Sequence, residues 1–219
     1  MDPNNPQNRL KGVTLVKGIV MGNTAYKLRE KDGDRTHEWK VYLRPYLDED
    51  IGRYITKVQF KLHDSYKNSN IQIEKPPFEV TETGWGEFDV NVKIFFADIN
   101  EKPIQTFHYI RLHAPLHNEG TENEFCGVEH YEELVFQDPT SVMADILNSI
   151  PPAIHNPTSF FTHFGDVHNQ QISTIRNARQ LIQKEIEDLK KNIIDGHEFL
   201  QSKISELKNV NIKKELLEG

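Results

Sequence analysis

The chain has 219 residues, of which 37% are hydrophobic, which suffices for one modest core rather than two. Its net charge is −7, and the acidic excess lies within residues 1–150, since residues 151–219 carry nine basic and nine acidic residues; such a surface disfavours a direct nucleic-acid partner. One cysteine excludes an internal disulfide, and no apolar run is long enough to cross a bilayer, so we expect an intracellular protein without a membrane partner.

The first ten residues, MDPNNPQNRL, contain almost nothing to bury, which predicts a disordered lead over residues 1–10. After this lead the hydrophobic period becomes two. The alternation is clearest from Phe88 to Phe96, where apolar residues occupy every second position and predict a half-buried strand. Shorter patterns of the same kind occur at Val13–Val20, Trp39–Leu43, Val58–Leu62, Phe78–Val80, Phe107–Leu112 and Tyr131–Phe136. Seven or so short strands predict an antiparallel β-sandwich.

A short helix is predicted from Ser141 to Ile150, because Pro151-Pro152 ends the pattern. Residues 151–169 follow as a linker. The apolar period then becomes seven, which predicts a coiled coil over residues 170–218 with a kink or register change at Gly196. One heptad position holds Ile172, Ile186, Ile193, Leu200 and Leu207, and the other holds Ile175, Ile182, Leu189, Val210 and Leu217.

An isolated helix with this stripe exposes too much apolar surface, so it needs a partner. The partner is either a second copy of the chain, which gives a homodimer, or a helix of another subunit. A helix folded back on the sandwich is the alternative.

The sequence shows no recognisable motif for catalysis or for binding a cofactor. His113 and His117 have helical spacing, but Pro115 lies between them, so we expect no metal site. Cys126 lacks the helix start or nearby base that activates a thiol, and neither a phosphate-binding glycine loop nor a nucleophile turn is present. We therefore expect a binding protein that uses no cofactor and is not an enzyme.

Two loops contain the residue types of a binding slot. Leu62-His63-Asp64-Ser65-Tyr66 follows one predicted strand, and Thr83-Gly84-Trp85-Gly86-Glu87-Phe88 precedes another. Strand ends carry the binding sites of sandwiches, and glycines beside an indole let a backbone approach a ligand closely. The two loops predict an aromatic slot with a few hydrogen-bonding groups. The alternatives are a core role for Trp85 and a turn-capping role for His63 and Ser65.

At these residues the sequence resembles the YEATS domain family, whose immunoglobulin-like sandwich reads acylated lysine on histone tails. The match continues, in order, through Lys11-Gly12-Val13-Thr14, Thr36-His37-Glu38-Trp39, Val58 to Tyr66, Pro76 to Val80, Thr83 to Phe88 and Val135 to Thr140. With the short helix, the resemblance assigns residues 11–150 to the domain. Because a predicted coiled coil follows, the chain is most similar to the glioma-amplified-sequence subgroup, whose members serve in chromatin-remodelling and histone-acetyltransferase complexes.

The resemblance implies that Tyr66 and Trp85 form the walls of an acyl-lysine channel, which His63 helps to shape. Ser65 would meet the acylated amide through its hydroxyl. The backbone N–H of Trp85 would donate to the acyl carbonyl.

By the same resemblance, Gly84 and Gly86 would let the tryptophan loop adopt its turn, and Phe88 would support the channel from beneath. Arg35 and His37 are candidates for the outer channel. Family members commonly have an aromatic residue or a histidine where Arg35 stands, so the arginine changes which acyl chains the channel tolerates.

The resemblance further implies a nuclear protein that binds acetyl- or crotonyl-lysine of histone tails and joins chromatin-complex subunits through its coiled coil. A lysine ammonium loses hydration in an aromatic slot, whereas acylation removes the charge and adds a flat amide, so the acylated form should bind better. Two alternatives are open. One is a methyl-lysine reader with Glu87 as the acid of an aromatic cage, and the other is an acidic scaffold or chaperone that docks whole histones.

Overall fold

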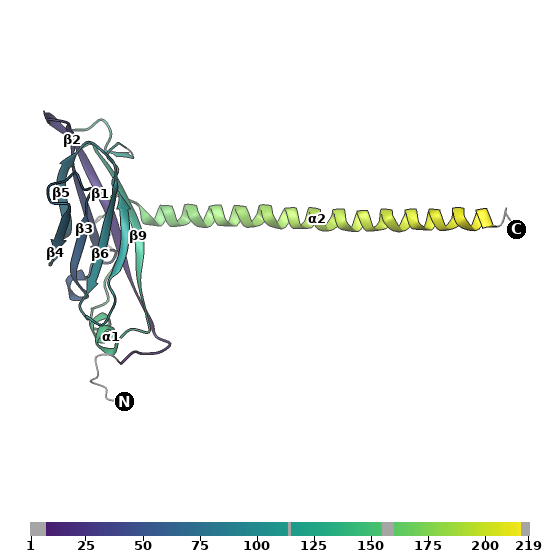
Figure 1. Ribbon diagram of the computed structural model, residues 1–219, viewed down its shortest axis with the longest axis horizontal. Helices are drawn as coiled ribbons and strands as arrows, with labels where there is room; N and C mark the ends of the chain where they lie inside the picture. Colours follow the sequence, from purple (N-terminus) through teal and green to yellow (C-terminus); the bar gives the residue numbers. More distant parts are fainter. Residues whose placement is uncertain (1–7, 114, 155–159, 216–219) are drawn as a thin grey trace. The chain divides into compact units, whose positions relative to one another are not determined.

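The computed structural model describes residues 8–113, 115–154 and 160–215, and the chain divides into two compact units, Met1–Thr162 and His163–Gly219. The first unit consists mostly of antiparallel strands, which confirms the β-sandwich part of the predicted fold class (Figure 1). Its described elements are β1 (Thr14–Asp32), β2 (Arg35–Pro45), a short 3-10 helix (Ile51–Arg53), β3 (Ile55–Lys61), β4 (Asn70–Ile73), β5 (Phe78–Gly84), β6 (Asp89–Phe96), β7 (Ile104–Tyr109), β8 (Leu116–His117), β9 (Phe125–Gln137) and α1 (Ser141–Asn148).

Two sheets enclose the core of this unit. One has the strand order β5-β2-β1-β9-β8 and the other the order β4-β3-β6-β7. The alternation predicted from Phe88 to Phe96 is observed in β6, where Val90, Val92 and Ile94 are fully buried between the sheets while Asp89 is exposed. Core side chains from both sheets include Trp39, Val41, Val58, Phe60, Val92, Ile94 and Phe78.

The strands β4 and β8 are absent from the sequence prediction. Each is short: β4 has four residues along the edge of β3, and β8 has two residues, which pair with Cys126 and Phe125 of β9. Neither segment is long enough to show a period-two pattern. Conversely, β1 extends well beyond the predicted Val13–Val20, because it pairs with β2 on one side and β9 on the other, and these ladders satisfy its backbone groups whatever its side chains are.

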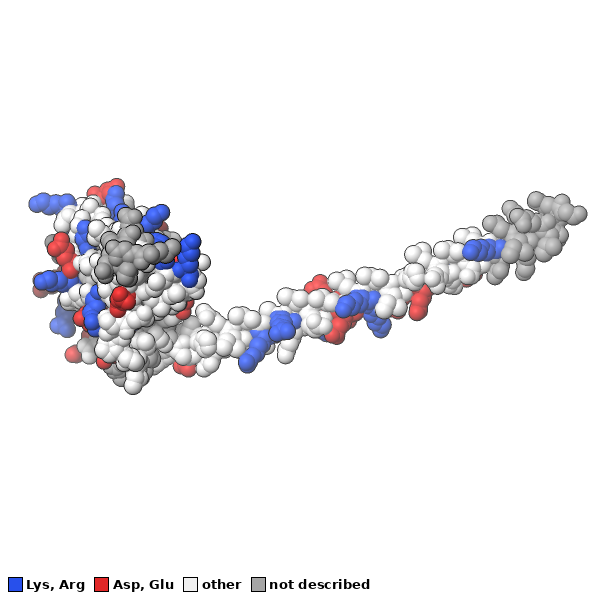
Figure 2. Space-filling model, turned by 90° about the horizontal axis from the view of Figure 1, so that it is seen from below, with Lys and Arg blue, Asp and Glu red and all other residues white. Residues whose placement is uncertain are grey.

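The second unit contains α2 (Phe164–Glu215), one helix that continues through Gly196 without a break. It begins within residues 151–169, the segment predicted to be a linker. Charged side chains of both signs are distributed along it (Figure 2). Its exposed large hydrophobic residues include the heptad members Ile175, Ile182, Ile186, Leu189, Ile193, Leu200 and Leu207. The side chain of Val210 and the whole of Leu217 lie outside the described part of the chain.

Among the helices that the structure describes, none is both long and apolar enough to cross a membrane. The extended α2 fails this criterion because its apolar residues are interspersed with charged ones.

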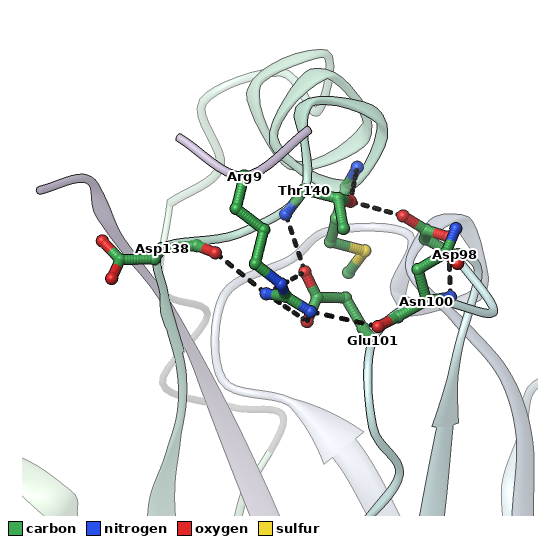
Figure 3. Close-up of polar contacts among 7 residues, drawn as sticks. Arg9, Asp98, Asn100, Glu101, Asp138 and Thr140 are labelled. Carbon is green, nitrogen blue, oxygen red and sulfur yellow. Dashed lines mark hydrogen bonds and ion pairs between the residues drawn. The ribbon is translucent and has the colours of Figure 1, made fainter. Parts of the chain in front are cut away.

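The N-terminal segment is ordered from Asn8 onward, which corrects part of the predicted disordered lead; residues 1–7 lie outside the described chain. The Arg9 guanidinium forms an ion pair with Glu101 at 3.2 Å and donates to the backbone oxygens of Asn100 and Asp138 (Figure 3). Leu10 N also donates to Pro139 O. The composition of residues 1–10 does not predict these contacts, because the partners of Arg9 are more than ninety residues away in the sequence.

The same cluster caps α1. The Thr140 hydroxyl accepts from Met143 N at the start of the helix and donates to a carboxylate oxygen of Asp98, while Glu101 accepts from Thr140 N at 2.8 Å. Burial alone would raise the pKa of Asp98, but hydrogen bonds from Thr140 and Asn100 outweigh it and lower that pKa. The network therefore joins the N-terminal segment, the β6–β7 loop and α1 at one end of the sandwich.

The segment predicted as a linker also contains an ordered part, which we call the aromatic strap (Phe160, Phe161 and Thr162). Phe160 is buried and stacks on Tyr46 with ring centroids 6.3 Å apart. Thr162 N donates to the buried Glu129 carboxylate at 2.9 Å. The strap thus packs on the five-stranded sheet.

A glycine makes room for the strap. A Cβ atom on Gly127 would lie 2.8 Å from the backbone oxygen of Asn23 and 2.9 Å from the Phe161 ring, so a larger residue in this position of β9 would have to displace β1 or the strap. Phe161 also packs against His117 and Phe125, at centroid distances of 4.5 and 5.3 Å. Sequence analysis missed this packing because it depends on a single strand glycine whose partner is more than thirty residues away.

A buried polar cluster links the two sheets. His108 of β7 is 2% exposed, and its Nε2 lies 3.0 Å from Oδ1 of Asn23 in β1. Asn23 also donates to Arg111 O and accepts from Arg111 N. Burial, with a smaller contribution from His130, lowers the pKa of His108 from 6.5 to about 4. The imidazole is therefore neutral in the folded state at physiological pH.

This depressed pKa predicts acid sensitivity. Below pH 6.5 the unfolded chain takes up a proton at His108 that the folded chain does not take up until about pH 4, so stability should fall across this window. The full loss at this site is on the order of 3 kcal/mol. Urea unfolding of the wild type and of His108→Gln at several pH values checks it. The variant should lose stability less steeply between these pH values, and equal slopes would contradict the assignment.

Candidate binding site

The two loops singled out in the sequence line one open cavity at an end of the sandwich. Its volume is about 1040 Å³, and its walls come from the β1–β2 turn, the segment after β3 and the end of β5 with the residues up to β6. The lining residues are Gly33, Asp34, Arg35, His63, Ser65, Tyr66, Lys67, Asn68, Glu82, Thr83, Gly84, Trp85, Gly86, Glu87 and Phe88. Strands of both sheets therefore position the walls.

An aromatic cluster supports one wall. The rings of Tyr66 and Phe88 lie 5.7 Å apart, and each contacts the buried Trp39 at 5.8 and 5.7 Å respectively. Trp39 Nε1 donates to the Tyr66 hydroxyl oxygen at 3.1 Å. His63 meets the edge of the Phe88 ring at 6.1 Å. Because Trp39 belongs to the central core, the position of Tyr66 is fixed from beneath.

His63 and Ser65 form a compact turn after β3. The backbone N–H of Ser65 donates to Nδ1 of His63 at 3.2 Å, and the Ser65 hydroxyl lies 2.9 Å from the same nitrogen. Since Nδ1 accepts the backbone N–H, the hydroxyl hydrogen also points to Nδ1, and the oxygen lone pairs stay available to another donor. The turn-capping role considered for these residues is therefore observed, and it is compatible with a binding role.

Trp85 does not belong to the core. Its side chain is 68% exposed and lines the cavity from the loop after β5, so the core alternative for this residue is wrong. The flanking glycines differ from each other. A Cβ on Gly84 would collide with the Tyr66 hydroxyl and lie 3.2 Å from Trp39 Nε1, whereas a Cβ on Gly86 would meet nothing within 4 Å. Gly84 is needed for the close approach of Tyr66, and Gly86 has no comparable contact.

Two groups of the cavity, the Tyr66 hydroxyl and the Glu87 carboxylate, have shifted pKa values. Burial raises the pKa of Tyr66, so its hydroxyl is neutral. Glu87 is the acid nearest in sequence to Trp85, but its carboxylate accepts the backbone N–H groups of Leu112 and His113 at 2.8 and 3.3 Å. These bonds outweigh burial and lower the pKa of Glu87. The carboxylate is thus committed to the segment after β7.

The structure brings together nearly all of the predicted site residues. His63, Ser65, Tyr66, Gly84, Trp85, Gly86 and Phe88 line the cavity, and so does Arg35. His37 does not: it is 4% exposed and its ring meets the edge of His113 at a centroid distance of 5.2 Å. Burial, and then the neighbouring His113, lower its pKa. The outer-channel assignment of His37 is therefore corrected, because β2 places this residue inside the sandwich.

Several lining residues escaped the sequence analysis. Asp34, Lys67 and Asn68 belong to polar turns that carry no periodic or aromatic signal, and only the fold brings them together. Trp39 was predicted only as a strand residue, although it holds Tyr66 in place. A tryptophan in a strand that also contains core residues gives no sequence signal of a supporting role.

The comparisons with known proteins agree with this geometry. A model of the YEATS family matches residues 34–114. The protein AF-9 homolog of Kluyveromyces lactis is 37% identical over 199 residues, which cover 81% of this chain and 90% of that protein.

Two solved structures are also similar to this chain, and in each the match covers 64% of this chain and 98% of the solved chain. One is the Yaf9 YEATS domain bound to H3K27ac, with 39% identity and a TM-score of 0.56. The other is the Yaf9 YEATS domain recognising an H3K122suc peptide, with 41% identity and a TM-score of 0.54.

The contact between Gly84 and Tyr66 predicts a stability difference between two neighbouring glycines. Gly84→Ala should lower the free energy of unfolding by about 1–3 kcal/mol, because a Cβ there overlaps the Tyr66 hydroxyl. Gly86→Ala, the matched control, should change it by less than about 0.5 kcal/mol. Urea denaturation measures both. In a Tyr66→Phe background the penalty for Gly84→Ala should shrink, and an unchanged penalty would show that the hydroxyl is not its cause.

Proposed function

Because the chain belongs to the YEATS family, we propose that it is a chromatin reader that binds acylated lysine, such as acetyl- or crotonyl-lysine of histone tails, in the cavity between Tyr66 and Trp85. The observation that carries the proposal is the shared cavity: residues of two distant loops, each expected from the resemblance, line it together. The Yaf9 domains solved with acylated histone H3 peptides support the ligand class.

The polar groups of the cavity suit a secondary amide. The Ser65 oxygen, whose hydrogen points to His63, would accept the N–H of the acyl amide, and the Trp85 backbone N–H would donate to its carbonyl. The flat amide and an unsaturated acyl chain would lie between the Tyr66 and Trp85 rings. Two hydrogen bonds of about 1 kcal/mol each, with stacking of about 1 kcal/mol per ring, must offset the ordering of a flexible tail, so binding should be micromolar or weaker.

A methyl-lysine cage is less well supported. Such a cage holds a cation with aromatic faces and usually an acid. Glu87, the acid considered for that role, already accepts two backbone N–H groups and lies 3.4 Å from the Arg111 guanidinium. A trimethylammonium group would have to compete with these bonds. The acidic-scaffold alternative, in contrast, is decided only by experiment.

We also propose that the chain acts by binding alone and is not an enzyme. Among the residues that the structure describes, no group of three or more His, Cys, Asp or Glu side chains could hold a metal ion. Cys126, the one cysteine, is buried in β9.

Substitutions at the cavity test the reader function. Trp85→Ala should weaken binding of a crotonylated histone H3 peptide at least about tenfold, and Ser65→Ala about fivefold, because one removes a stacking wall and the other an acceptor of about 1 kcal/mol. Isothermal titration calorimetry with crotonylated, acetylated, trimethylated and unmodified peptides measures this. Phe107→Ala, which removes an exposed aromatic ring of β7 outside the cavity, is the matched control and should bind normally.

The outcomes separate the three candidate functions. Tighter binding of the trimethylated peptide would replace the acyl-lysine reader with the methyl-lysine reader. Whole histones that bind the wild type and Trp85→Ala equally, with no acyl preference, would favour the acidic scaffold.

We further propose that α2 forms a coiled coil, either with a second copy of the chain or with subunits of a chromatin complex in the nucleus. Its exposed heptad residues support this, because a stripe of isoleucines and leucines is unfavourable in water. In a homodimer, two weak cavities on one particle could engage two tail sites and raise the apparent affinity.

Charge introduced into the heptad stripe tests the homodimer. Sedimentation equilibrium should show the full-length wild type as a dimer and Ile186→Glu with Ile193→Glu as a monomer, because buried glutamates oppose each other across the seam. Ser173→Glu with Gln180→Glu adds the same charge at outward heptad positions and should leave the dimer intact. A monomeric wild type would exclude the homodimer. The coiled coil with a subunit of a chromatin complex would then be the proposal that is left.

A further inference from the structure

Arg35 lines the cavity at a position where the resemblance leads us to expect a histidine or an aromatic residue. It is the first residue of β2, directly after the turn that contains Gly33 and Asp34. It shares the cavity with Ser65, Tyr66 and Trp85. An arginine here places a permanent positive charge in the lining of a cavity that also contains aromatic rings.

The structure holds the guanidinium against the tryptophan loop. Arg35 Nη1 donates to the Thr83 hydroxyl at 2.7 Å, and Thr83 belongs to β5, the strand that leads into Trp85. The β2–β5 ladder pairs His37 with Gly84, the residue before Trp85. An anchored guanidinium loses less side-chain entropy when it binds a ligand than a free one does.

The charge of Arg35 acts on the Tyr66 hydroxyl, but other groups act more strongly. Burial and, to a smaller degree, Glu82 raise the pKa of this hydroxyl, whereas the hydrogen bond from Trp39 and, least of all, Arg35 lower it. A neutral acetyl or crotonyl chain gains little from a guanidinium. A carboxylate gains more, because the planar fork of N–H donors matches its two oxygens.

We propose that Arg35 is a specificity-determining residue that makes the cavity favour acyl-lysines ending in a carboxylate, such as succinyl- and glutaryl-lysine, over neutral acyl chains of the same length. The proposal rests on the acyl-lysine reader function. The amide is held by Ser65 and Trp85, and the carboxylate end of the chain reaches Arg35. One Yaf9 YEATS domain recognises a succinylated peptide, which establishes that this fold can accept such a chain but not which residue selects it.

Other charged residues of the cavity limit the size of the preference. Lys67 adds a second positive charge from the segment after β3, whereas Asp34 and Glu82 oppose a carboxylate. Glu87 contributes less, because its carboxylate is bound to two backbone N–H groups and faces Arg111. The preference should therefore be modest, about threefold to tenfold, as for a partly exposed ion pair with good geometry.

The test compares one histone H3 peptide carrying succinyl-lysine with the same peptide carrying its neutral terminal amide, and with the crotonylated peptide. Calorimetry on the full chain should show that the wild type binds the carboxylate peptide about threefold to tenfold more tightly than the amide peptide. This difference is the size expected for an exposed ion pair. Arg35→Gln should bring this ratio to about one, mainly by weakening the binding of the succinylated peptide. Lys102→Gln, which removes one positive charge from the β6–β7 loop outside the cavity, is the matched control and should keep the wild-type ratio.

The results distinguish the role of Arg35 from the acyl-lysine reader function on which it rests. A wild type that binds crotonyl-lysine but shows no preference for the carboxylate overturns the role of Arg35 and leaves the reader function intact. A preference that survives Arg35→Gln but disappears in Lys67→Gln assigns the selection to the other cation and also overturns it. If no acylated peptide binds at all, the reader function itself fails.

Discussion

The position of the Tyr66 hydroxyl is the constraint on which the cavity depends. It is fixed by the indole N–H of Trp39 from the core and by the missing side chain of Gly84 on the neighbouring sheet. Tyr66 follows β3 and Gly84 ends β5, so this contact joins the two sheets at the end of the sandwich. Any shift of the hydroxyl would also move the Phe88 ring, since the two rings touch, and with it the support of His63. The wall of the cavity is thus an extension of the hydrophobic core.

The opposite wall is built differently. Trp85 is mostly exposed and stands on a loop without a supporting ring contact among the described residues. Core rings hold Tyr66 in place, whereas no such ring in the described part of the chain supports Trp85, and this difference suits the proposed reader of acyl chains of several shapes. The exposed indole also costs some solubility, and an exposed aromatic side chain at the rim of a cavity is most simply explained by a ligand that covers it.

Sequence reasoning predicted the residues that line the cavity better than it predicted the boundaries of the fold, and the reasons are physical. The alternation of β6 and the glycine-flanked Trp85 are local signals, because each is set by neighbours in the chain. The Arg9 cluster and the aromatic strap are not local: the partners of Arg9 are more than ninety residues away, and Phe161 packs against a strand position, Gly127, that has no side chain. His37 was misplaced for a related reason. A histidine beside the expected channel looks functional in the sequence, but the register of β2 decides that it faces inward.

The two ends of the sandwich have different energetic tasks. At one end, polar groups satisfy each other: Arg9, Glu101, Asp98 and Thr140 form a closed network in which the carboxylates have donors, which fixes the N-terminal segment and α1. At the other end, the Ser65 oxygen retains acceptor capacity and the rings of Tyr66 and Trp85 line open space. Because the polar groups at one end are paired with each other, the domain can keep its fold while acceptor groups at the other end remain available to a ligand. The closed network fixes one end of the domain without using any polar group of the cavity. In the proposed reader, two rings and a few polar groups in an open cavity give only weak binding of one tail. A protein built this way gains useful affinity by presenting its cavity more than once, or by being carried to its target, and α2, with its exposed heptad stripe, is the part of the chain suited to either role.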